Sequence, residues 1–455
     1  DDTVGVKALD EYTVQYTLTA PVPYFESFLV TEIFLPNHKE FSDQCGTKFG
    51  TSPDQLLYCG AYILQSWQRN KEFVMVKNEN YYDADKVSVE KIVLQKITDG
   101  AATVEMFKRG ELTGTSLTGD QVEHYMQDSE WGQYVTLRDK FPNFESPNSE
   151  FNAFVQNEDF RLALYHALDR VTIAQLYNPY DTEDMLTNLI CPEDVCYDEN
   201  GIDYTDYAPL KEIKERGAAT YDPALAKEYF EKALSAVTDG SGNIRGASAG
   251  EVKMGRTFSF QTDGKLPLQL VYVHGASSDE VSMAQIIKMN LEEVFGSENI
   301  EVILSQFTGD KYNDVIAPGN FDFAYDNYSF KYADPLSQLD RLTTGGAVND
   351  GRYSLPQFDA LVKEASEKLV ASERYELFAQ AEGMLIDGGY IIPWESGGGT
   401  YGMTREIPFT APRGGFGLSR FKYKGMQLSE EPISAEQYKQ LEDEFYEQLL
   451  KRNAG

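Results

Sequence analysis

The chain has 455 residues, of which 42% are hydrophobic and 13% aromatic, so it can form two or more large cores and is not intrinsically disordered. Its formal net charge of −33 is spread along the whole sequence. Such a surface repels nucleic acid and anionic lipid, so neither is expected as a direct partner. No apolar stretch approaches the roughly 20 residues that cross a bilayer, and no signal peptide is visible at Asp1.

The first third of the chain predicts short strands and short helices. Residues 11–18 alternate in polarity and stop before Pro21, as a strand that enters a loop does. The run 60–83 spaces its apolar residues around a polar break, which predicts two strands joined by a turn. Asp99 predicts the start of a helix that ends near Met106, and Thr118 with Gln121 predicts a capping box.

The middle and last thirds predict an α/β arrangement. Residues 268–273, 302–304 and 321–325 have the composition of buried strands, and the first two flank a predicted helix, Asp279–Phe295. A strand, a helix and a second strand in this order predict a largely parallel sheet. Further helices are expected at 157–170, from Asp222-Pro223, at Leu355–Val370 with a Ser354/Gln357 cap, at Glu373–Ile386 and from Ser434.

Four cysteines leave the redox compartment open. Cys191 and Cys196 enclose four residues, and Cys45 and Cys59 bracket a loop, so local pairing is the simplest of three connectivities. Two disulfides would require an oxidising compartment, and free thiols remain the alternative. A zinc site is disfavoured because there is no C-x-x-C and the four histidines are scattered.

No sequence motif for catalysis, metal binding or cofactor binding meets the structural requirements of its class. The Gly246–Gly250 stretch matches G-x-S-x-G, but it lacks the preceding hydrophobic strand of a nucleophile elbow and is typical of a flexible loop. The 73 acidic residues are too numerous for a hydrolase pair to be singled out. We therefore predict no catalytic residue, no metal and no cofactor.

The strongest candidate site follows the predicted strand at 321–325. Ligands dock at strand ends in open α/β sheets, and aromatic residues here alternate with Asn, Ser and Lys. The alternative is a simple strand-to-helix loop that stops at Pro335. The predicted ligand-binding residues are Tyr325, Asn327, Tyr328, Ser329, Lys331 and Tyr332, with Phe307 and Trp394.

Seven stretches occur in one order that resembles a known family. They read EYTVQYTLTAPVPYF, GAYILQSW with VKNENYYD, FKRGEL, NEDFRLALYHALDR, YDPALAKEYFEKA, FDFAYDNYSFKYADP and IIPW. Together they resemble the family 5 extracellular solute-binding proteins, the oligopeptide and dipeptide receptors of ABC importers. The resemblance spans nearly the whole chain, except Asp181–Arg216 and Asp239–Asp263.

The resemblance implies a periplasmic-binding-protein-like fold of type II, with mixed sheets and two lobes around a hinge. Lobe I would combine 1–140 with 398–455, and lobe II would span 141–397. The family has a long segment before the EYTVQYTL strand, so we expect the N-terminal part of lobe I to be missing here.

The resemblance also implies a function without covalent chemistry. The protein would be the extracellular substrate-binding component of an ABC importer, a monomer that captures peptides or a related small polar solute by lobe closure. Its partners would be the transmembrane subunits of a permease. It would be a membrane-anchored lipoprotein at the cell surface, or periplasmic. The alternatives are a carbohydrate receptor of the same fold and an extracellular hydrolase that uses carboxylates.

One residue departs from the family pattern. In peptide-binding members, the aspartate of a G-W-x-x-D-Y segment holds the α-amino group of the ligand. In this sequence Tyr328 stands at the Trp position and Lys331 at the Asp position. An ammonium there would favour a carboxylate or an acidic side chain. The alternative is that Lys331 pairs with Asp326 or Asp334 and does not meet the ligand.

Overall fold

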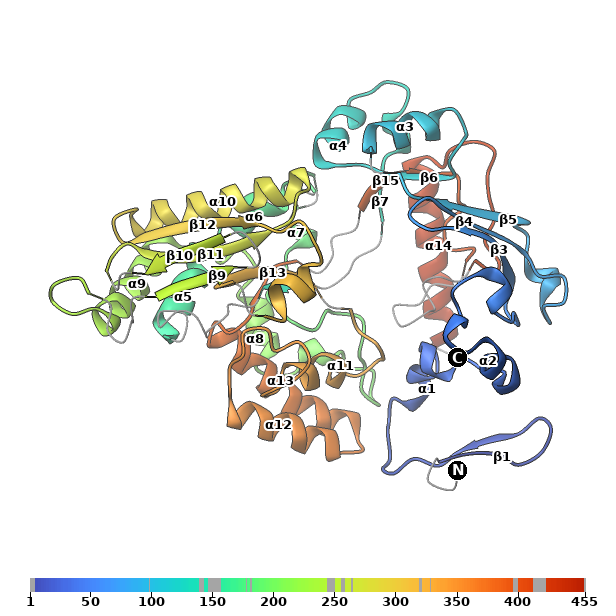
Figure 1. Cartoon of the computed structure of the whole chain (residues 1–455), viewed down its shortest axis with the longest axis horizontal. Coiled ribbons are helices and arrows are strands. Elements are labelled where there is room, and N and C mark those ends of the chain that lie inside the picture. Colours follow the sequence, from blue (N-terminus) through green and yellow to red (C-terminus); the bar gives the residue numbers. More distant parts are fainter. Residues whose placement is uncertain are drawn as a thin grey trace. The chain divides into compact units, whose positions relative to one another are not determined.

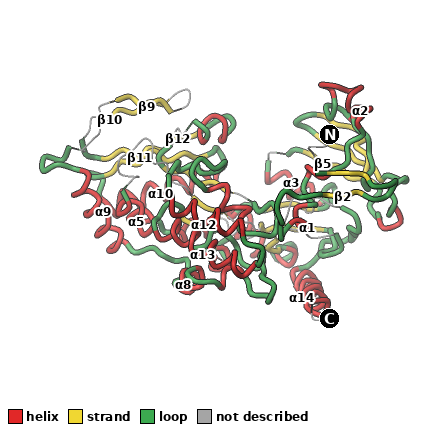
Figure 2. Tube along the Cα trace, turned by 90° about the horizontal axis from the view of Figure 1, so that it is seen from below, coloured by secondary structure: helices red, strands yellow, loops and turns green. Residues whose placement is uncertain are grey.

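The structure is a computed structural model that packs into two compact units (Figures 1 and 2). Unit 1 combines Asp1–Leu29, Pro142–Arg170 and Thr187–Glu395, and unit 2 combines Val30–Phe141, Val171–Leu186 and Ser396–Gly455. The described residues are 5–97, 99–138, 143–145, 157–176, 178–180, 182–243, 250–254, 258–262, 265–318, 321–327, 329–395, 400–411 and 423–453. Tyr328 and most of the Gly246–Gly250 motif lie outside them.

A five-stranded mixed sheet forms the centre of unit 1. Its order is β12 (Ile300–Gln306), β11 (Leu268–His274), β13 (Phe323–Asn327), β8 (Asn143–Glu145) and β14 (Ile392–Pro393). β11 runs parallel to β12 and β13, whereas β8 is antiparallel to β13 and β14. Helix α10 (Ser278–Phe295) connects β11 to β12, so the predicted strand-helix-strand unit is confirmed.

Helices pack in pairs within unit 1. α5 (Glu158–Ala167) contacts α9 (Pro223–Val237), and α12 (Pro356–Glu367) contacts α13 (Ala371–Asp387). The shorter helices of this unit are α1 (Phe25–Phe28), α8 (Leu210–Glu215) and α11 (Leu336–Leu339), and α6 (Arg170–Ala174) begins at its boundary and continues in unit 2. Two separate hairpins pair β1 (Val6–Ala8) with β2 (Val14–Tyr16) and β9 (Gly250–Met254) with β10 (Phe258–Thr262).

Unit 2 contains two three-stranded antiparallel sheets. One has the order β3 (Tyr62–Gln68), β4 (Glu72–Lys77) and β5 (Lys91–Gln95). The other places β15 (Thr400–Thr404) between β6 (Gly114–Ser116) and β7 (Thr136–Arg138). Its helices are α2 (Lys39–Cys45), α3 (Gly100–Lys108), α4 (Gly119–Met126), α7 (Thr182–Met185) and α14 (Ala435–Asn453). None of the described helices has both the length and the apolar character of a membrane span.

Local capping explains where several helices begin. The Asp99 carboxylate accepts hydrogen bonds from the N–H groups of Ala101 and Ala102, and Thr118 with Gln121 forms the predicted capping box. The predicted Ser354/Gln357 cap is wrong. Helix α12 begins at Pro356, whose fixed φ suits the first helical position, and the N-cap residue Leu355 makes no side-chain cap.

The two units differ from the predicted lobes at two places. Residues Asp1–Leu29 group with unit 1 instead of with the rest of 1–140, and Val171–Leu186 groups with unit 2 instead of with 141–397. The C-terminal stretch pairs with β6 and β7 through β15, as expected for a segment that returns to the N-terminal part of the chain. The lobe assignment itself stays a prediction.

Candidate ligand-binding site

Strand β13 carries Tyr325, whose side chain is fixed by the residues that follow β14. The Tyr325 hydroxyl donates a hydrogen bond to Glu395 Oε1 (2.9 Å), and its ring lies edge-on to Trp394 with centroids 6.1 Å apart. Trp394 was predicted to contact ligand, but only 1% of its surface is exposed. In this structure Trp394 is therefore a buried neighbour that packs edge-on against the ring of Tyr325.

Lys311 is a neighbour of Tyr325 that the sequence did not single out. Its ammonium lies 3.5 Å from Asp326 Oδ1, donates to the carbonyl of Tyr325 and lies 5.8 Å from the centroid of the Tyr325 ring. The cation thus compensates the charge of Asp326 at the strand end. Lys311 precedes Tyr325 by 14 residues, and no local pattern in the sequence indicates this contact.

The loop after β13 is held against helix α1 by aromatic contacts. Tyr332 stacks on Tyr24 with centroids 4.5 Å apart and an interplanar angle of 12°, and Phe28 meets the Tyr332 ring edge-on at 5.3 Å. The N–H of Ala333 donates to Ser27 Oγ (3.0 Å). Burial raises the pKa of Tyr332, so its hydroxyl is neutral.

A buried ion pair fixes the base of the same loop. Arg374 donates through Nε and Nη2 to the two carboxylate oxygens of Asp334, at 3.1 and 2.8 Å, and donates through Nη1 to three main-chain carbonyls around the end of α12. Burial raises the pKa of Asp334, although Arg374 beside it lowers that pKa. These two parallel hydrogen bonds pair the guanidinium of Arg374 with the carboxylate of Asp334, so the base of the loop is rigid.

Lys331 lies on this loop at the surface of the protein. Its side chain is exposed, and its N–H donates to Ser337 Oγ (2.7 Å). In the described part of the chain its ammonium forms no ion pair. Asp326 and Asp334 pair with Lys311 and Arg374. The alternative in which one of them neutralises Lys331 is therefore wrong for this structure.

The remaining predicted site residues are dispersed. Ser329 is half-buried in the loop, and the main chain of Asn327 pairs with Asn143 at the end of β13. Phe307 packs instead against the hydrophobic cluster that contains Val271 and Phe321. The structure thus brings Tyr325 of β13 together with Trp394, which follows β14, and it places Lys331 and Tyr332 on the loop that follows β13.

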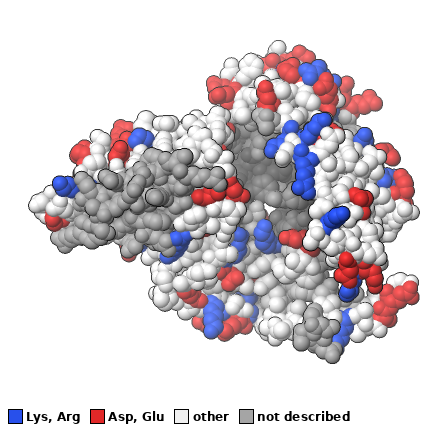
Figure 3. Space-filling view, viewed as in Figure 1, with Lys and Arg blue, Asp and Glu red and all other residues white. Residues whose placement is uncertain are grey.

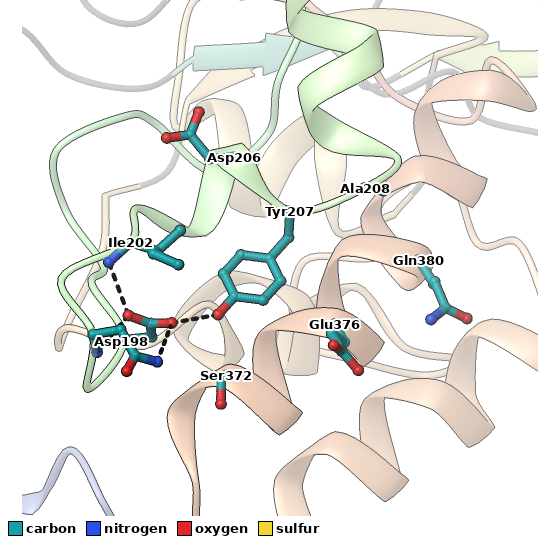
Figure 4. A pocket seen from close by; sticks show the side chains of 9 residues that line it. Asp198, Ile202, Asp206, Tyr207, Ala208, Ser372, Glu376 and Gln380 are labelled. Atoms are coloured by element: carbon teal, nitrogen blue, oxygen red, sulfur yellow. Dashed lines mark hydrogen bonds between the residues drawn. The ribbon is translucent and has the colours of Figure 1, made fainter.

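A separate polar cavity of about 610 Å³ lies between the loop 198–208 and α13 (Figure 4). The carboxylate of Asp198 is occupied there by its own loop, since it accepts hydrogen bonds from the N–H groups of Asn200 and Ile202 and from the Tyr207 hydroxyl. Among the residues that the structure describes, no group of three or more His, Cys, Asp or Glu is arranged to hold a metal ion.

All four cysteines are free thiols in this structure, so neither predicted local disulfide is formed. Cys191 and Cys196 are buried beside Glu382, whose carboxylate accepts hydrogen bonds from the N–H of Cys191 and the hydroxyl of Tyr204. Burial raises the pKa of both thiols well above the ordinary value. Both groups are therefore neutral and poor nucleophiles.

Comparisons with known proteins agree with the resemblance in the sequence. A family model described as "Bacterial extracellular solute-binding proteins, family 5 Middle" matches residues 1–350. The chain is 28% identical to the oligopeptide-binding protein SarA of Streptococcus gordonii and 27% identical to AliA of Streptococcus pneumoniae. Each alignment covers 99% of this chain and 74% of the relative.

Solved structures show the same fold. Listeria monocytogenes OppA bound to peptide matches with a TM-score of 0.72 at 20% identity, over 94% of this chain and 75% of that one. The substrate-binding domain of a Bacillus anthracis oligopeptide ABC transporter matches with a TM-score of 0.73 at 18% identity, over 94% and 76%. The predicted α/β, periplasmic-binding-protein-like fold is thus confirmed, and the chain belongs to the family 5 bacterial extracellular solute-binding proteins.

Proposed function

We propose that this protein is the substrate-binding component of an ABC importer and that its ligands are oligopeptides. The observation that carries the proposal is the alignment of 99% of the chain with proteins named for oligopeptide binding. The family acts by binding, so we propose that the chain changes no covalent bond. Transmembrane permease subunits and a lipid anchor at the cell surface belong to the same proposal.

The segment after β13 supports a peptide-binding role on physical grounds. The half-buried rings of Tyr325 and Tyr332 are each fixed by neighbours before any ligand arrives. Such preorganisation lowers the entropy that binding must overcome. We propose that Tyr325, Ser329, Lys331 and Tyr332 contact ligand and that Trp394 positions Tyr325.

Titration calorimetry with peptides of two to nine residues, in acidic, neutral and basic sets, tests this proposal. We expect saturable heat with at least one set and a dissociation constant in the micromolar range or tighter. The Tyr325→Phe variant, which loses only the hydroxyl contact to Glu395, should bind more weakly than wild type. No heat with any peptide, together with tight binding of an oligosaccharide, would contradict the proposal.

A further inference from the structure

One groove in unit 2 stands apart from the site on unit 1. It has a volume of about 650 Å³ and lies at the turn end of the β3–β4–β5 sheet, which Figure 1 labels. We call it the β3–β5 groove; its apolar floor is Trp67, Phe73 and Leu94, and its rim is Arg69, Lys71 and Lys96.

The strand register explains why these side chains share one face. Trp67 lies opposite Phe73, and Phe73 lies opposite Leu94, so the three point to the same side of the sheet. Trp67 stacks on Phe73 with centroids 5.4 Å apart, yet 38% of Phe73 and 44% of Leu94 remain exposed. Apolar side chains are therefore available at the surface of this groove.

The rim concentrates positive charge in a protein whose net charge is −33. The Arg69 guanidinium lies 4.9 Å from the centroid of the Trp67 ring. Within the described residues, none of Arg69, Lys71 and Lys96 forms an ion pair. The nearby carboxylate of Glu72 belongs to the other face, because neighbours along a strand alternate and Phe73 faces the groove. The groove therefore has a local field opposite to that of the whole chain.

The edge of the sheet adds a second mode of recognition. β5 pairs with β4, and the described residues provide no partner along its other side. An open strand edge can accept an extended segment through main-chain hydrogen bonds, while side-chain pockets beside it select the sequence. The concave shape of the groove suits an inserted side chain better than a flat membrane surface.

We propose that the β3–β5 groove binds an extended acidic polypeptide segment of a partner protein. The segment would pair its main chain with β5, place an apolar side chain against Leu94 at the open edge of the apolar floor, and direct carboxylates to the three rim cations. This surface lies wholly in unit 2 and does not depend on the peptide-binding role proposed for the loop after β13.

The probe for this proposal is a nonapeptide in which Thr occupies every even-numbered position. Glu and Phe take turns at the odd-numbered positions, so that they share one face of an extended chain. It is acetylated and amidated so that it carries no free terminus. A matched probe has Lys in place of Glu. Calorimetry and Trp fluorescence of the whole chain should detect the Glu probe, with affinity that falls steeply as salt rises. The Lys probe should bind at least tenfold more weakly.

Two triple variants distinguish the effect of the groove cations from the effect of the net charge of the protein. Arg69→Gln/Lys71→Gln/Lys96→Gln should weaken the Glu probe at least tenfold, and Leu94→Ala should do so as well. Lys211→Gln/Lys227→Gln/Lys363→Gln removes three exposed lysines of unit 1 and should bind as wild type does. Circular dichroism spectra that match wild type establish that each variant is folded.

Three results would overturn the proposal. These are equal binding of the Glu and Lys probes, unchanged binding by the folded groove variant, and groove-dependent binding to phosphatidylglycerol vesicles without binding of the Glu probe. The last would assign the groove to a membrane instead. The peptides used to test the proposed function should bind to the Arg69→Gln/Lys71→Gln/Lys96→Gln variant as they bind to wild type. That result would support the peptide-binding role of the loop after β13, whether or not the Glu probe binds the groove.

Discussion

Asp322 is a buried acid in the core of unit 1, directly before β13. It is 1% exposed, and its Oδ2 accepts a hydrogen bond from the N–H of Val271 (2.9 Å). Among the described residues, Oδ1 has no hydrogen-bond partner. Burial raises the pKa of Asp322 from the ordinary 3.8 to about 7.

This pKa predicts a loss of stability as pH rises. Below about pH 4 both the folded and the unfolded chain hold the proton, and there is no penalty. Between about pH 4 and 7 the unfolded chain releases it while the folded chain resists ionisation, so the free energy of unfolding falls. The gap between the two pKa values corresponds to roughly 4 kcal/mol.

The Asp322→Asn variant should remove this dependence. Urea unfolding at pH 4, 5.5, 7 and 8 should show that the variant gains stability relative to wild type as pH rises. The gain in the free energy of unfolding should reach at most roughly 4 kcal/mol. Asp85→Asn, at an exposed position, should leave the wild-type profile unchanged. Parallel profiles for Asp322→Asn and wild type would contradict the account.

Lys331 sets a charge preference, if it meets ligand as we propose. Replacing its ammonium with a carboxylate in Lys331→Asp should weaken acidic peptides and strengthen basic ones, each by roughly three- to tenfold because the position is exposed and screened. Lys363→Asp, an exposed lysine on α12, is the matched control. Unchanged calorimetric affinities across both peptide sets would exclude Lys331 from the site.

At the scale of elements, the loop 329–335 is fixed from two directions. Helix α13 holds its base through Arg374 and Asp334, and helix α1 holds its middle through Tyr24 and Ser27. The partners come from segments that are far apart in sequence. The geometry of the loop is therefore fixed without ligand, as the binding site that we propose here requires.

Breaking the buried ion pair should be costly. Arg374→Ala leaves Asp334 buried without its cation, and this should lower the free energy of unfolding by roughly 3–5 kcal/mol. Arg216→Ala removes a half-exposed partner of Asp387 and should cost less than about 1 kcal/mol. Urea unfolding followed by tyrosine and tryptophan fluorescence compares the two variants. Equal costs would contradict the role assigned to Arg374.

The contact with α1 should matter for affinity as well as for stability. Tyr24→Ala removes the ring that stacks on Tyr332, so the loop should lose order and peptide affinity should fall roughly tenfold. Tyr12→Ala is the control, because 89% of Tyr12 is exposed. Calorimetry measures both variants. Wild-type affinity in Tyr24→Ala would mean that the stack does not position the loop.

Local patterns predicted elements better than they predicted the site. Asp99, Thr118 and Ser434 cap the helices that the sequence indicated, because capping depends on residues within one turn. The strand before Tyr325 also lies where predicted, within two residues. Each of these features depends on a short stretch of sequence.

The site depends on distant partners that no local pattern encodes. Tyr24, Lys311 and Arg374 reach the loop from other segments, and the burial of Trp394 follows from the packing of the whole unit. The cysteines illustrate the same limit. Their spacing permitted local disulfides, whereas the structure keeps Cys191 and Cys196 as thiols beside Glu382.

At the scale of the whole molecule, charge is uneven in a way that the net value conceals. Acidic side chains are spread over the visible surface (Figure 3), in keeping with the net charge of −33. Lys331 and the three rim cations of the β3–β5 groove are among the cations that form no ion pair with the described residues. They carry binding proposals because they lie beside exposed or half-buried aromatic and aliphatic side chains and remain available to anionic groups.

The chain alternates between its two units, since each unit is built from three separate stretches of sequence. We propose that this protein retains an intact peptide by non-covalent contacts at the segment after β13. Native mass spectrometry of the full chain with a mixed peptide library tests it most directly. We predict complexes whose mass equals protein plus one unmodified peptide, and a smaller fraction of these complexes in Tyr24→Ala. No complex with any peptide, or the appearance of cleaved peptides, would contradict the claim.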